Sequence, residues 1–239
     1  MRVNWNYIKM MSLLGLVVGL FAFSSNRNAV RKVSVPNINF EGDDNLFITH
    51  ETVSKLLIQN QQGIKNMPKE TLDLNQLETA LNSNPMIKSA QVYVSVKGLL
   101  TADVEQKKPI ARVSANASYY IDDECFYMPL SSNYTARVPL VTGQIEKNSL
   151  QNVFSIANKI YNDDFLKTNV IQIHQNSDKT IYLKLRQCSF IVQLGKVENL
   201  DKKTNNLKAF YKKASKEKTL NKYSKVNLQF DNQVVCTKT

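Results

Sequence analysis

Residues Leu81–Val104 read LNSNPMIKSAQVYVSVKGLLTADV and decide the fold of the first half of the chain. The pair Asn84-Pro85 predicts the end of a helix, because the residue before a proline is disfavoured in helical conformation. The pair Lys97-Gly98 then predicts a turn between two strands in which apolar and polar residues alternate. The residues expected on the buried face of this hairpin are Ala90, Val92, Val94, Val96, Leu100, Ala102 and Val104.

The sequence before this hairpin predicts one strand and two helices. Val33–Phe40 (VSVPNINF) is expected at a sheet edge, since its proline cannot donate a hydrogen bond to a neighbouring strand. Thr49 predicts one helix start, and Asp73 followed by Gln76 predicts a second. Strand, helix, helix, strand and strand over residues 33–106 predict a small α+β domain. The helix stripes are Val53, Leu56, Leu57 and Asn60, then Leu74, Leu77 and Leu81.

Residues 107–239 predict a second α+β domain, with two helices and a largely antiparallel sheet. The helices are expected at Leu150–Tyr161 and Leu200–Lys216, and Val138–Gly143 is expected to be an irregular buried crossing. The chain should close with a hairpin that turns at Asp231-Asn232. The expected strands are Ile110–Val113, Tyr119–Ile121, Cys125–Met128, Val170–His174, Ile181–Leu185, Phe190–Leu194, Val226–Phe230 and Gln233–Cys236.

The N-terminal segment predicts one membrane-spanning helix. Met10–Phe23 is uncharged and apolar, and extending it to residues 7–25 gives a helix of about 28 Å, close to the hydrocarbon thickness. Residues 1–6 would form a short cytoplasmic tail. A cleaved signal peptide has a similar start, but Phe23 stands where its cleavage site needs a small residue. We therefore expect an uncleaved anchor with the domains outside the cytoplasm, although the flanking basic residues do not settle its orientation.

The composition argues against a nucleic-acid-binding protein. The net charge is +11 over 239 residues, but ten lysines and only three acids lie within residues 196–225. Because the excess is confined to that stretch, no extended basic surface for nucleic acid is indicated. The lysines flank the apolar stripe of the predicted helix Leu200–Lys216, as on a solvated helix face. Attraction to anionic lipid or wall polymer is the alternative.

The chain carries no pattern typical of an enzyme, a metal site or a cofactor site. P-loop, GxSxG, GxGxxG and HExxH motifs are absent, and only two histidines occur. The acidic groups Asp122-Asp123-Glu124 and Asp163-Asp164 fall at predicted turns or helix ends, where carboxylates are solvated. We expect no catalysis, no metal, no cofactor and no small-molecule substrate. Cys188 and Cys236 are the pair that an oxidising compartment would join, although buried free cysteines are the commoner case.

Short motifs follow one another along almost the whole chain. One is Leu81–Val92, with the pattern L…NP-x-I-x-x-A-x-V. Another is Leu100–Ala111, which ends in V-x-Q-x-x-P-I-A from Val104 and has Asp103 directly before that valine. The others are Val35–Gly42, Tyr120–Asp122, Val138–Gly143, Leu194-Gly195 and Val226–Phe230. Their order resembles that of the bacterial cell-division family FtsQ/DivIB, and the asparagine-rich composition resembles members from Bacteroidetes.

The resemblance implies a POTRA domain (β-α-α-β-β) at residues 33–106 and an FtsQ-type β domain at 107–239. It implies a non-catalytic divisome scaffold, single-pass and type II in the bacterial inner membrane, with its C-terminal domains in the periplasm at the septum. The scaffold would link early division proteins to septal peptidoglycan synthesis through FtsB/FtsL-type partners.

The expected binding mode is addition of a partner strand to the terminal hairpin. The residues expected to contact that partner are Tyr223, Lys225, Val226, Leu228, Phe230, Val234 and Val235. A second, recruiting surface is expected on the POTRA domain at Val53, Leu56 and Asn60, with the edge strand Val33–Phe40.

Two other classes of protein remain open. A POTRA-containing outer-membrane assembly factor would need a long run of barrel strands, which residues 107–239, with two amphipathic helices, do not supply. A secreted or periplasmic enzyme would need a cleaved signal peptide and a cluster of acid and base side chains.

Overall fold

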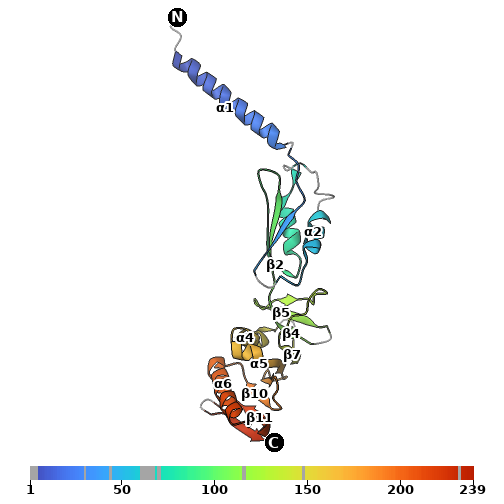
Figure 1. Cartoon of the computed structure of the whole chain (residues 1–239), viewed down its shortest axis with the longest axis vertical. Coiled ribbons are helices and arrows are strands. Elements are labelled where there is room, and N and C mark those ends of the chain that lie inside the picture. The colour runs from blue at the N-terminus through green and yellow to red at the C-terminus, as the bar shows by residue number, and fades with distance from the viewer. Residues whose placement is uncertain are drawn as a thin grey trace. The chain divides into compact units, whose positions relative to one another are not determined.

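The computed structural model describes residues 5–29, 31–42, 45–59, 68, 71–114, 117–146, 149–230 and 233–239 (Figure 1). The chain divides into two compact units, Met1–Gln106 and Lys107–Thr239. The first unit contains the N-terminal helix and a three-stranded sheet. The second contains a nine-stranded sheet, counted over the described residues.

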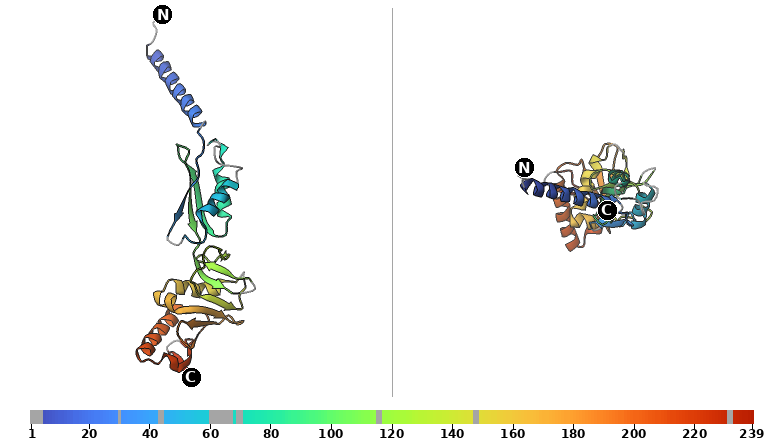
Figure 2. Two further views of the ribbon diagram at one scale, coloured as in Figure 1. Left: turned by 45° about the vertical axis from the view of Figure 1, so that its right-hand side comes forward. Right: turned by 90° about the horizontal axis from the view of Figure 1, so that it is seen from above.

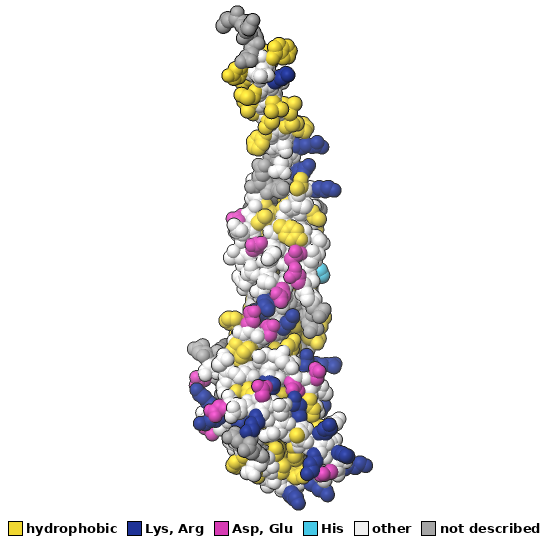
Figure 3. Space-filling model, turned by 90° about the vertical axis from the view of Figure 1, so that its left-hand side faces the viewer, with side chains coloured by type: hydrophobic (Ala, Val, Ile, Leu, Met, Phe, Trp, Pro, Cys, Tyr) yellow, Lys and Arg dark blue, Asp and Glu magenta, His cyan; other side chains and the backbone are white. Residues whose placement is uncertain are grey.

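Helix α1 (Trp5–Ala29) carries hydrophobic side chains along most of its length, as the upper end of Figure 3 shows. Trp5–Asn28 is long and apolar enough to cross a membrane. These 24 residues correspond to about 36 Å of helix, which exceeds a hydrocarbon core of about 30 Å. The helix therefore extends beyond the expected residues 7–25 at both ends.

The small α+β domain has the element order expected from the sequence. Its sheet order is β1-β3-β2, with β1 parallel to β3 and β2 antiparallel to β3. Both helices lie on one side of this sheet (Figure 2), and their buried residues form one core with the strands. The elements are β1 (Asn37–Glu41), α2 (His50–Gln59), α3 (Leu74–Asn82), β2 (Ile87–Val94) and β3 (Leu100–Gln106).

The helix starts of this domain are capped by the predicted residues. The Oγ1 of Thr49 accepts the Thr52 N–H at 3.2 Å, and the Oδ1 of Asp73 accepts the Gln76 N–H at 3.0 Å. Each cap satisfies one backbone donor that the first helical turn leaves unpaired. The cap positions therefore follow from local sequence.

Two details of the expected hairpin domain are wrong. The edge strand begins at Asn37 rather than Val33, because the proline before it cannot continue the ladder with β3. Val96 is 71% exposed instead of buried, since β2 ends at Val94 and the turn has begun. The turn itself is confirmed: Gly98 has a φ of +87° and its N–H donates to the Ser95 carbonyl.

The second unit is a mixed sheet with order β12-β11-β10-β9-β8-β7-β4-β5-β6. Its described pairings are parallel between β10 and β11, β7 and β8, and β4 and β7, and antiparallel elsewhere. The strands are β4 (Pro109–Val113), β5 (Tyr119–Asp122), β6 (Tyr127–Met128), β7 (Leu140–Gly143), β8 (Val170–Gln175), β9 (Ile181–Leu185), β10 (Ile191–Gly195), β11 (Tyr223–Asn227) and β12 (Val235–Lys238).

Three α-helices accompany this sheet over the described residues, where the sequence predicted two. They are α4 (Gln151–Tyr161), α5 (Asp164–Asn169) and α6 (Leu200–Lys216), with a short 3-10 turn at Leu220–Lys222. Helix α5 was not predicted, because six residues are too few to show an apolar stripe. Helices α4 and α6 bury Val153, Ile156, Ile160 and Leu207 in one core with the sheet.

The segment Val138–Gly143 is not an irregular crossing, because its last four residues, Leu140–Gly143, form the regular strand β7. Strand β7 lies between β4 and β8 and is parallel to both. The sequence signal was weak because only four residues pair and only Val141 is fully buried. Gly143 has a φ of +99°, and a Cβ there would lie 2.0 Å from the Gln175 carbonyl oxygen. A glycine is therefore required where β7 and β8 approach each other.

Asp122 organises the turn between β5 and β6. Its carboxylate is buried, accepts the N–H groups of Glu124 and Phe126, and pairs with the Lys107 Nζ at 2.8 Å. Cys125 adopts a φ of +68° in this turn, so the expected strand Cys125–Met128 is reduced to Tyr127–Met128. The turn role predicted for this acidic group is confirmed by the hydrogen bonds of Asp122. The expected solvation of its carboxylate is wrong, because Asp122 is only 1% exposed.

Replacing Gly143 with alanine should lower the free energy of unfolding by about 2–4 kcal/mol, because the new Cβ meets backbone and φ is unfavourable for other residues. Urea unfolding of the full chain in detergent micelles measures the loss. Ser215→Ala, an exposed change within α6, is the control and should be neutral. Equal stability of the two variants would contradict the close approach of β7 and β8.

Asp122→Ala should cost about 2–4 kcal/mol, because it leaves Lys107 without its buried partner and two turn amides without their acceptor. The same unfolding measurement applies. The control is Glu198→Ala, which removes an exposed carboxylate that forms no ion pair with a described residue. A loss no greater than that of the control would refute the structural role of Asp122.

Candidate protein-binding edge of the C-terminal sheet

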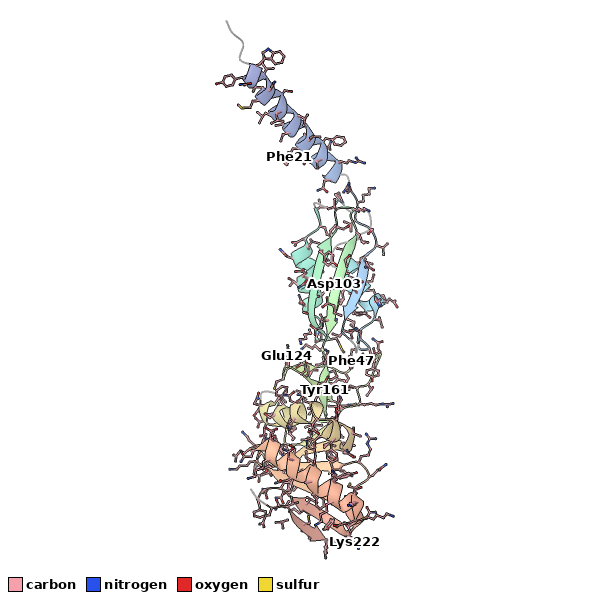
Figure 4. The ribbon with its side chains drawn as sticks, turned by 60° about the vertical axis from the view of Figure 1, so that its left-hand side comes forward. Phe21, Phe47, Asp103, Glu124, Tyr161 and Lys222 are labelled. Carbon is pink, nitrogen blue, oxygen red and sulfur yellow. The ribbon has the colours of Figure 1, made fainter. Side chains whose placement is uncertain are left out.

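Strand β12 forms one edge of the nine-stranded sheet. It pairs antiparallel with β11, and no described strand pairs with its other side. The strand is the last element of the chain, near the labelled residue Lys222 in Figure 4. An edge of this kind presents a row of backbone donors and acceptors that another chain can use.

The direction of the free backbone groups follows from one hydrogen bond. The Thr239 N–H donates to the Lys222 carbonyl, toward β11. Because backbone groups alternate in direction along a strand, the N–H and C=O of Cys236 and the N–H of Lys238 point away from β11. The Lys238 carbonyl accepts a hydrogen bond from the Ser224 Oγ of β11 at 3.3 Å. These two residues therefore supply the free side of the ladder.

The neighbouring strand β11 is fixed on both sides. It is parallel to β10 and antiparallel to β12. Beyond its end, the Leu228 N–H donates to the Gln193 carbonyl at 2.9 Å. The side chain of Gln229 fills the space beside Gly195, where a Cβ would lie 2.6 Å from its Nε2. These contacts hold the segment after β11 against β10. As a result, β12 and not β11 is the outermost strand at this edge of the sheet.

The predicted contact residues divide between three places. Tyr223, Lys225 and Val226 lie on the interior strand β11, where both sides of the ladder are paired, and Val226 is fully buried. The expected strand Val226–Phe230 is wrong in its second half: Leu228 is buried beyond the strand end and Phe230 is exposed in a bend. Val235 lies on the edge strand and Val234 directly precedes it. The expected turn Asp231-Asn232 lies outside the described residues.

The sequence prediction missed Thr237 and Lys238, which belong to the edge strand. The run Val234-Val235-Cys236-Thr237 is rich in β-branched residues and was the available signal. Side chains alternate along it: Val235 and Thr237 are exposed, whereas Cys236 is partly buried against the core. Burial raises the pKa of the Cys236 thiol.

The residues expected to form a recruiting surface on the first domain are not all available. Val53 is fully buried in the core, so it cannot contact a partner. Leu56 is partly buried and packs against the same core. Asn60 lies outside the described residues.

The remaining reactive groups have structural roles. Among the described residues, no group of three or more His, Cys, Asp or Glu side chains could hold a metal ion. Asp163 caps α5 through the Leu166 N–H and pairs with the Lys208 Nζ at 2.6 Å. Burial raises the pKa of Asp163, but these bonds outweigh it and hold that pKa below its usual value. Cys188 and Cys236 are both free thiols.

Comparison with known families identifies both domains. A family model described as FtsQ/DivIB, C-terminal related, matches residues 108–237, which is more than half of the chain. This chain belongs to the FtsQ/DivIB family. A model described as a POTRA-like domain matches residues 36–105. No curated protein matches the chain.

Membership in FtsQ/DivIB confirms the family and the fold class predicted from the sequence. The protein combines one apolar N-terminal helix, a POTRA-like domain and a sheet-rich C-terminal domain. The family indicates a division-related protein that acts through protein–protein contacts, and α1 fits a single-pass membrane protein.

Hydrogen exchange should reveal the free side of β12. The amide hydrogens of Cys236 and Lys238 should exchange at least about tenfold faster than that of Val192 in β10, because they point away from β11. Thr237 should be slower than its two neighbours, since its amide faces β11. Equal protection of Cys236, Thr237 and Lys238 in the isolated FtsQ/DivIB chain would show that the edge is already occupied.

Proposed function

We propose that this protein is a non-catalytic divisome scaffold that binds FtsB/FtsL-type partners by accepting one of their segments as an additional strand on β12. The observation that supports this most directly is the unpaired outer side of β12. A partner strand placed there gains main-chain hydrogen bonds, while side chains beside it set specificity.

The physical case rests on the order of the last strands. Because β11 is held between β10 and β12, a partner does not need to displace an existing strand. Val235 and Thr237 are exposed on one side of β12, next to the outward backbone groups of Cys236 and Lys238. The binding residues proposed on this basis are Val234 and Val235 from the sequence prediction, together with Thr237 and Lys238.

The remaining parts of the proposal concern placement. Helix α1 would hold the chain in the inner membrane as an uncleaved type II anchor, with both domains in the periplasm at the division site. There the scaffold would link early division proteins to septal peptidoglycan synthesis. Recruitment would use the POTRA-like domain, at its exposed edge strand β1 rather than at Val53.

A proline at Lys238 tests the edge directly. Lys238→Pro removes an N–H that points away from β11, and proline is tolerated at such a position of an edge strand. Co-purification of FtsB/FtsL-type partners with the full chain should fall about fivefold, since one backbone hydrogen bond is worth about 1 kcal/mol. Membrane insertion should remain unchanged.

Lys238→Ala is the matched control, because it removes the same side chain but keeps the N–H. It should retain the partner far better than Lys238→Pro. If both variants bind as the parent chain does, or if both lose the partner equally, strand addition on β12 is refuted. Deleting Val235–Thr239 should abolish co-purification.

A further inference from the structure

The sheet of the second unit has a face that the helices leave uncovered. The core residues of α4 and α6 pack against one side of strands β7–β11. The side chains that alternate with those core residues include His174, Lys184 and Ile191, and all three are exposed. We name this surface the open face.

The strand register arranges the open face in two rows that run across the strands. The basic row consists of Arg112, Leu140, Gln172, Lys184, Ile191 and Lys225, one residue from each of β4 and β7–β11. The polar row consists of Thr142, His174, Tyr182, Gln193 and Asn227. Neither row contains a carboxylate.

The cations of the basic row are not neutralised. None of Arg112, Lys184 and Lys225 forms an ion pair with a described carboxylate. Adjacent strands lie about 4.8 Å apart, so Lys184 and Lys225, two strands apart, are separated by about 10 Å. An unneutralised basic surface favours a partner that carries acidic residues.

A concave site covers part of both rows. It has a volume of about 520 Å³, and its lining includes Gln172, His174, Tyr182, Lys184 and Ile191 from the rows, together with Asn176 and Ser189. The polar lining is held in place: Gln172 Nε2 donates to Thr142 Oγ1 at 3.0 Å, and that hydroxyl is 2.9 Å from His174 Nδ1. The site combines an aromatic ring, an aliphatic side chain and fixed polar groups.

This combination fits an extended peptide better than a uniform polyanion. Uncharged side chains separate the cations, so a polymer with closely spaced charges would leave most of its charges unpaired. In a polyproline-II segment, residues three apart lie on one side about 9 Å apart, which matches the spacing of Lys184 and Lys225. Aromatic-lined grooves are also the usual docking sites for such segments.

We propose that the open face binds an acidic, polyproline-II-like segment of a partner protein, with carboxylates at Lys184 and Lys225 and an apolar residue beside Tyr182. The site occupies the face of β9–β11 and needs no strand addition, although Lys225 lies beside Thr237 of β12.

Binding of a labelled peptide with a Pro-Thr-Glu repeat to the full chain in detergent micelles tests this. Its dissociation constant, measured by fluorescence anisotropy, should rise about tenfold or more in Lys184→Glu/Lys225→Glu and should also rise with salt. The matched control Lys212→Glu/Lys213→Glu makes the same charge change at exposed positions of α6 and should bind like the parent. A Pro-Thr-Lys peptide should not bind.

Lys184→Gln/Lys225→Gln removes the two charges without adding acids, so it controls for misfolding caused by the Glu substitutions. Its loss of peptide affinity should lie between that of the parent chain and that of Lys184→Glu/Lys225→Glu. Equal losses in the two Glu variants, or no binding by the parent chain, would overturn the proposal. Polyphosphate that binds the open face while the acidic peptide does not would replace it with a polymer site. Lys238→Pro should leave peptide binding unchanged. If this variant loses the peptide, the peptide binds at β12; that result would refute the open-face site but not the proposed strand addition on β12.

Discussion

The parallel pairing of β10 with β11 governs the organisation of the C-terminal domain. Two parallel neighbours in one sheet cannot be joined by a hairpin, so the chain must cross over between them. Helix α6 is that crossover, and its apolar stripe covers the sheet on the way. Strands β7 and β8 are also parallel, and α4 and α5 connect them. Because these crossovers share one side, the sheet keeps its other side exposed.

The same pairing explains why the last strand is the free one. Strand β11 lies parallel beside β10, and β12 pairs antiparallel with the outer side of β11. The contacts of Leu228 and Gln229 with β10 hold β11 in this interior position. The proposed partner edge thus depends on side-chain packing two strands away from it.

The sequence predicted features that depend on local patterns. Helix α6 was predicted at its observed residues, and Asp73 caps α3 as expected, because apolar spacing and capping are read within a few residues. The end of β11 at Asn227 was missed, since it depends on the contact between Gln229 and Gly195, 34 positions apart in sequence. For the same reason, Tyr223 and Lys225 were assigned to an edge when they lie inside the sheet. The function class came from the order of the short motifs, through the resemblance to FtsQ/DivIB that the family match confirms, and not from any catalytic or ligand-binding motif.

The shortness of β12 has a consequence for self-association. Its outer side offers the N–H groups of only Cys236 and Lys238, and hydrogen bonds of this kind contribute about 1 kcal/mol each. Bringing two molecules together costs roughly 4–15 kcal/mol, so bare edges of two copies cannot hold each other. Backbone pairing along β12 alone is therefore too weak to hold a second chain, and a bound chain must add buried side chains of its own to remain attached.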